Sequence, residues 1–87
     1  MKQVNLVALF KVTKRYNEFP YLSFVIQHYA FLLRGHKRKD GNFSYMLSFN
    51  LDDYFCSFTA NNDEEAIEDV LKDRNWVNMS FELIKKF

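Results

Sequence analysis

The chain of 87 residues has little of the residues that most constrain or release a backbone: one cysteine, one proline and two glycines. The lone Cys56 excludes a disulfide within the chain and is typical of a protein of the reducing cytosol. Gly35 and Gly41 are too few for a glycine-rich phosphate-binding loop. The sequence therefore argues against a disulfide scaffold and against a nucleotide-binding loop.

A strong charge bias and a long apolar segment are also missing. Lys and Arg number 12 against 11 Asp and Glu, so the net charge of +1 does not favour binding of polyanions over the whole surface. The N-terminal residues lack the apolar core of a signal peptide. The longest apolar segment, residues 19–33, is shorter than the roughly 20 residues of a membrane-spanning helix. We expect a cytoplasmic protein that makes no contact with a membrane.

Aromatic side chains are abundant, at 18% of the residues, in a chain that is 48% hydrophobic. A chain of this length is expected to form a single domain over residues 1–87. Its core is too small for all sixteen aromatic side chains, ten of which are Phe. We therefore expect an apolar surface that a partner or a second copy covers.

Alternating and helical patterns divide the chain into six predicted elements. Residues 3–13 alternate with period two and predict a strand. Residues 21–33 are nearly all apolar, with Asn17 as an N-cap before them and Gly35 as a C-terminal cap after them, which predicts a helix over residues 17–34. A buried strand is the alternative there, because Asp40-Gly41 is a hairpin signal. Length favours the helix, since about fifteen residues is long for a strand.

The second half of the sequence predicts a hairpin, a helix and a last strand. Residues 43–50 and 54–59 alternate on either side of a turn, so both apolar sides fall on one face. Asn62 and Glu65 resemble a capping box at the start of a helix that ends near Asp73. Residues 76–84 alternate again.

This β-α-β-β-α-β order predicts an α+β fold, the ferredoxin-like or split βαβ sandwich. Right-handed crossovers would give a four-stranded antiparallel sheet in the order 4-1-3-2, with two helices on one face. The likeness is to an architecture that hosts unrelated functions, so function has to be argued from a site.

Two candidate binding surfaces follow from that topology. The first is a basic end of the molecule, where clustered cations would bind phosphate by releasing counterions. It comprises Arg34, His36, Lys37, Arg38, Lys39, Lys85 and Lys86. A solvated loop neutralised by the acids of residues 63–65 is the alternative interpretation.

The second candidate is the sheet face that the helices leave open, with Val7, Leu9, Met46 and Phe55 as a partner or dimer interface. RNA-recognition motifs stack bases on such a face. Here the expected face offers one aromatic residue, Phe55, and the chain has no matching signature. We therefore favour the protein interface.

A catalytic or metal site is not expected. Cys56 falls on the core side of its strand, which is typical of an inert, packed cysteine. His28 and His36 with this cysteine have no metal-ligand spacing, and the adjacent Asp52 and Asp53 are accounted for as turn residues. The sequence predicts no cofactor and no enzymatic activity.

The leading hypothesis is a small non-catalytic cytosolic protein that associates with itself and regulates or inhibits a macromolecular partner. Abundant Phe, Tyr, Asn and Lys is typical of AT-rich coding, so an inhibitor encoded by a phage or mobile element fits. The alternative is binding of RNA or single-stranded nucleic acid through the basic end.

Overall fold

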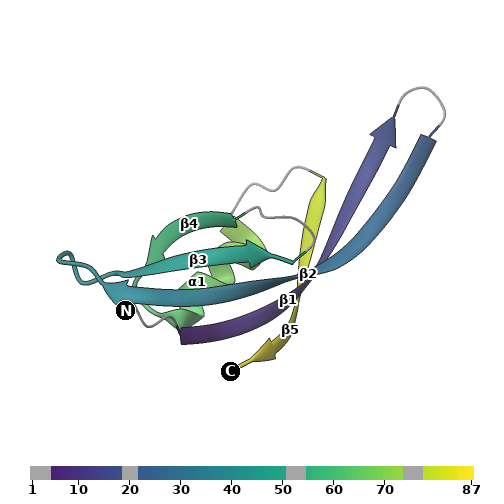
Figure 1. The fold of residues 1–87 in the computed structure, drawn as a ribbon. Coiled ribbons are helices and arrows are strands. Elements are labelled where there is room, and N and C mark those ends of the chain that lie inside the picture. Colours follow the sequence, from purple (N-terminus) through teal and green to yellow (C-terminus); the bar gives the residue numbers. More distant parts are fainter. Residues whose placement is uncertain (1–4, 19–21, 51–54, 74–77) are drawn as a thin grey trace.

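The computed structural model describes residues 5–18, 22–50, 55–73 and 78–87. They form a five-stranded antiparallel sheet in the order β4-β3-β2-β1-β5, with a short helix packed on one face (Figure 1). The elements are β1 Asn5–Glu18, β2 Leu22–Lys37, β3 Phe43–Phe49, β4 Phe55–Ala60, α1 Asp63–Glu68, the π-helical turn η1 Asp69–Asp73, and β5 Met79–Lys86.

The predicted ferredoxin-like fold is wrong, because the segment expected as the first helix is the long strand β2. It pairs with β1 from Asn5 opposite Arg34 to Glu18 opposite Leu22. Side chains on both faces of β2 are apolar, so its sequence lacks the alternation that marks a half-buried strand. Gly35 does not end a helix; it lies at an irregularity where β2 pairs with β3. The sheet has five strands and not four, and it is not ordered 4-1-3-2.

Neighbouring strands follow each other along the chain from β1 to β4, and one longer connection then crosses the sheet. The turn between β2 and β3 is closed by Gly41, whose φ of +91° suits glycine, and by Asp40, whose side chain accepts from the Asn42 N–H at 3.0 Å. After β4 the chain passes through α1 and η1 and returns as β5 beside β1. The one crossing element therefore covers one sheet face and leaves the other open.

The core lies between the sheet and this helix. Its largest fully buried side chains are Phe10, Val12, Leu32, Tyr45, Leu47 and Val70. A bulge between Leu6 and Ala8 turns Val7 inward, where it is 4% exposed. Met79, Phe81 and Leu83 complete the core from β5, as their alternation predicted.

The helix predicted from Asn62 is present, and its first turn is tied to the sheet. The Asn62 side chain accepts from the Glu65 N–H at 2.9 Å, as an N-cap does. Asp63 accepts from the Arg34 guanidinium at 2.6 Å and from the Tyr45 hydroxyl at 2.7 Å. Burial and then the bond to Asp63 raise the pKa of Tyr45 well above its ordinary value of 10.0, which keeps the hydroxyl protonated as a donor.

β1 and β2 extend past the rest of the sheet as a two-stranded arm, seen at the upper right of Figure 1. β5 pairs with β1 no further than Lys14, and β3 pairs with β2 only from Ala30 onward. We define the arm as residues 15–18 and 22–25, and the remainder of the described chain as the body. The arm accounts for the elongated shape, about 50 Å by 25 Å by 20 Å.

Candidate binding surfaces

The sheet face opposite α1 carries a connected set of apolar side chains, which we call the open face. Strand register aligns Leu9 with Phe31, Phe31 with Ser48, and Ser48 with Phe55. A second row runs from Leu6 through Leu33 to Met46. The rows cross four and three strands that lie about 4.8 Å apart, and in the first row the polar Ser48 lies between Phe31 and Phe55.

The open face is partly exposed in the described chain. Phe55 is 59% exposed, Leu6 and Tyr29 are also exposed, and the side chains between them are half-buried. Of the four residues predicted for a partner interface, Leu9, Met46 and Phe55 do share this face by register. Val7 does not, because the bulge places it in the core. Large contiguous apolar patches are associated with interaction sites, so the open face is a candidate binding surface.

Sequence reasoning missed Phe31 and Leu33, which lie at the centre of the open face. Both were assigned to the predicted helix. The signal that could have placed them was the combination of Val25-Ile26 with the Asp40-Gly41 hairpin signal, since β-branched residues and tight turns favour strands. Tyr29 was missed for the same reason.

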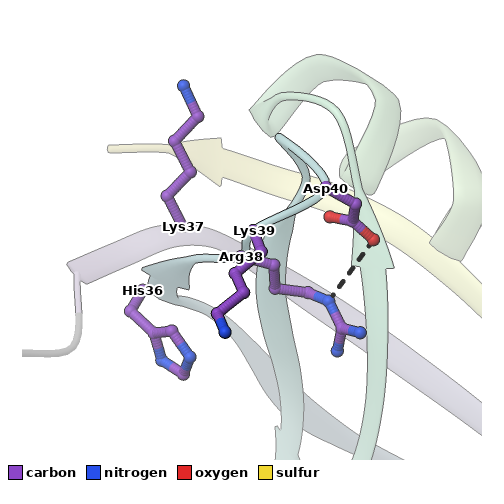
Figure 2. A pocket seen from close by; sticks show the side chains of 5 residues that line it. All are labelled: His36, Lys37, Arg38, Lys39 and Asp40. Carbon is purple, nitrogen blue, oxygen red and sulfur yellow. Dashed lines mark ion pairs between the residues drawn. The ribbon is translucent and has the colours of Figure 1, made fainter.

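The basic turn after β2 does not form a convergent phosphate site. Figure 2 shows Lys37 pointing away from His36 and Lys39, and Arg38 reaching back to Asp40, with 3.6 Å between Nε and the carboxylate. Lys37 instead approaches the Phe43 ring, at 5.9 Å from its centroid. His36 and Lys39 are exposed, so the turn presents dispersed charges to solvent.

The other predicted basic residues have different surroundings. Arg34 is bound to Asp63, and Lys86 forms an ion pair with Glu64 at 3.0 Å. Lys85 is aligned with Leu9, and Leu9 with Phe31, so Lys85 lies two strands from β2. The six residues from Phe31 to Lys37 add a separation of about 20 Å along the strand. The predicted convergence of Lys85 with the turn is therefore not present.

The described residues offer no arrangement typical of catalysis. No group of three or more His, Cys, Asp or Glu side chains is placed to bind a metal within the described ranges. His28 is buried beside Phe49, with ring centroids 5.9 Å apart, and its Nδ1 has no hydrogen-bond partner in this part of the chain. Cys56 packs against the core. None of the helices described is long and apolar enough to cross a membrane.

Comparison with known proteins found no matching family model, no similar curated protein and no similar solved structure.

Proposed function

We propose that this chain is a small non-catalytic binding protein that holds a protein partner against its open face. The observation that supports this most directly is the set of apolar side chains that share the open face by register, from Leu9 on β1 to Phe55 on β4. It remains partly exposed although the same sheet buries a full core on its other side. Covering such a surface with a complementary protein removes apolar area from water, which is the main driving force for association.

Base stacking is the competing use of this face, since Tyr29, Phe31 and Phe55 all carry aromatic rings. Nucleic acid also requires cations beside the rings. By register Lys11 lies between Tyr29 and Glu82, whose carboxylate offsets its charge, and Lys85 lies beside Leu9. The charge pattern therefore favours a protein partner. A regulator or inhibitor acting by occlusion needs only such a surface and no catalytic group.

The test is affinity capture from the cell that naturally produces the chain, with nuclease treatment in one arm. We expect a defined protein to be retained after nuclease treatment. Phe55→Glu should reduce the amount retained at least about tenfold, because a charge buried within an interface costs on the order of 2 kcal/mol or more. Leu9→Glu should act in the same direction. Lys39→Glu, on the exposed turn, is the matched control and should retain the partner.

Two results would overturn the proposal. One is a bound protein whose retention is unchanged by both Phe55→Glu and Leu9→Glu. The other is a bound fraction that nuclease removes and that Lys39→Glu weakens, which would point to nucleic acid at the basic turn instead.

A further inference from the structure

One edge of β2 has no neighbouring strand over its first half, within the described part of the chain. β2 begins at Leu22, but β3 pairs with it only from Ala30. Asn50 closes the ladder at this point. Its N–H donates to the Tyr29 carbonyl at 3.0 Å, and its side-chain oxygen accepts from the Tyr29 N–H at 2.9 Å.

The hydrogen bonds of Tyr29 to Asn50 show which residues of β2 direct their backbone N–H and C=O groups toward the unpaired edge. Backbone groups alternate in direction along a strand, so Gln27, Val25 and Ser23 face outward like Tyr29, whereas Ile26 faces β1. The other strand of the arm agrees with this. Arg15, the partner of Val25, also faces away from the β1–β2 ladder, since its N–H donates to the Asn78 carbonyl at 2.8 Å. Three donors and three acceptors therefore point away from β1 along this edge, where no strand among the described residues pairs with them.

The edge lacks the usual protection against pairing. Edge strands of monomeric proteins are normally interrupted by charges, proline or bulges. Residues 22–29 contain no Asp, Glu, Lys, Arg or Pro, and the β1–β2 register has no irregularity there. Val25 is 54% exposed and Phe24 is also exposed. A two-stranded ribbon is only marginally stable in water by itself, so this arm gains from a further strand.

We propose that a second copy of the chain pairs with this edge, antiparallel and around a two-fold axis at Val25. Val25 then forms a doubly hydrogen-bonded pair with Val25 of the partner subunit, and Ser23 forms one with Gln27 of the partner subunit. Every outward donor and acceptor from Ser23 to Gln27 is satisfied in both copies. An axis at Ile26 would instead place Ser23 opposite Tyr29 of the partner subunit, and Asn50 already occupies the outward groups of Tyr29.

The side chains suit the same register. Phe24 lies opposite Ile26 of the partner subunit, on the face where Tyr16 stacks on Phe24 with centroids 4.8 Å apart. No like charges are brought face to face, because the paired segment is uncharged. The partner's β2 continues the line of β3, so the two sheets join into one.

This dimer goes beyond the proposed function and does not depend on it. The two-fold axis is perpendicular to the sheet, so both open faces point to the same side. A partner with two binding sites would gain avidity from such a pair. Substitutions can separate the two proposals, because Val25 in the arm tests the dimer and Phe55 in the body tests the protein partner, and they lie on different strands.

The test is sedimentation equilibrium of wild type, Val25→Lys and Val25→Glu. We expect a wild-type dimer and an increase of at least tenfold in the dimer Kd for each variant alone, because like charges meet at the axis. An equimolar mixture of the two variants should recover the dimer. Asn17→Lys, on the other strand of the arm, is the control and should leave the dimer intact. A monomeric wild type, or a dimer unaffected by Val25→Lys, overturns the proposal.

Cysteine pairing tests the register independently of any change in folding. In a Cys56→Ser background, Val25→Cys should form an intermolecular disulfide, because opposed Cα atoms about 5.5 Å apart are within disulfide range. Ser23→Cys alone should not, since it is displaced about 13 Å along the strand from its own copy. Ser23→Cys mixed with Gln27→Cys should crosslink. Equal crosslinking of all single variants would contradict the register.

Discussion

The body and the arm are built from the same two strands, yet they depend on different contacts. In the body, β5 and β3 flank β1 and β2, and the helix covers Phe10 and Leu32, which are fully buried. In the arm the two strands pair with each other, with Tyr16 stacked on Phe24, and one described contact joins them to the body, from the Arg15 N–H to the Asn78 carbonyl. A two-stranded ribbon is only marginally stable by itself, so we expect the arm to be less stable than the body.

The largest expected effect on stability comes from a substitution in the core of the body. Phe10→Ala should lower the free energy of unfolding by about 3–5 kcal/mol, because it removes a fully buried ring and leaves a cavity. Phe24→Ala in the arm should cost about 1.5 kcal/mol or less, the value of an exposed aromatic pair. Urea denaturation at a concentration where the chain is monomeric measures both. Equal losses would contradict the division into body and arm.

Removing the contact that holds the helix to the sheet should lower the free energy of unfolding by a smaller amount. Asp63→Ala leaves the Tyr45 hydroxyl and the Arg34 guanidinium without their shared acceptor, which should cost about 1–3 kcal/mol. Glu64→Ala removes the exposed ion pair with Lys86 and is the matched control, with an expected loss below about 1 kcal/mol. Urea denaturation separates the two. A loss for Glu64→Ala as large as that for Asp63→Ala would show that the partly buried bonds of Asp63 to Arg34 and Tyr45 do not hold the helix to the sheet.

Local patterning predicted the elements of the body that are apolar on one side. β1 as far as Thr13, the β3–β4 hairpin, the Asn62 cap and β5 are expected near their observed positions. In each, one face meets the core and the other is mixed, so the period is visible in the sequence. The expected helix start with its Asn17 cap is wrong, because residues 14–18 continue β1 and Asn17 pairs with Ser23. The predicted turn at residues 51–53 lies outside the described residues.

The arm and β2 could not be predicted in the same way. Ser23, Val25 and Phe31 face one side of β2, and Ile26 and Leu32 the other, so both sides are largely apolar and the period of two disappears. Length then favoured a helix, because a sixteen-residue strand is far above the average. The strand is this long because β1 pairs with it from Leu22 to Arg34 and β3 pairs with it as far as Lys37. That is a tertiary cause with no local signal.

The same error displaced the candidate sites. A helix at residues 17–34 does not place Phe31 and Leu33 on the open face. It also removes β2 from the predicted sheet, and with it the unpaired edge of that strand. The basic residues were expected to converge at one end. In the structure Arg34 and Lys86 instead hold the first turn of α1, through Asp63 and Glu64.

Amide hydrogen exchange of the wild-type chain tests the pairing of the arm most directly. The amides of Phe24 and Ile26 face β1 and serve as internal controls for those of Ser23, Val25 and Gln27, which face the bare edge. We predict that the latter three become as slow as the controls as protein concentration rises, and lose this protection on dilution. Fast exchange of these three amides at every concentration, beside protected controls, would contradict the account.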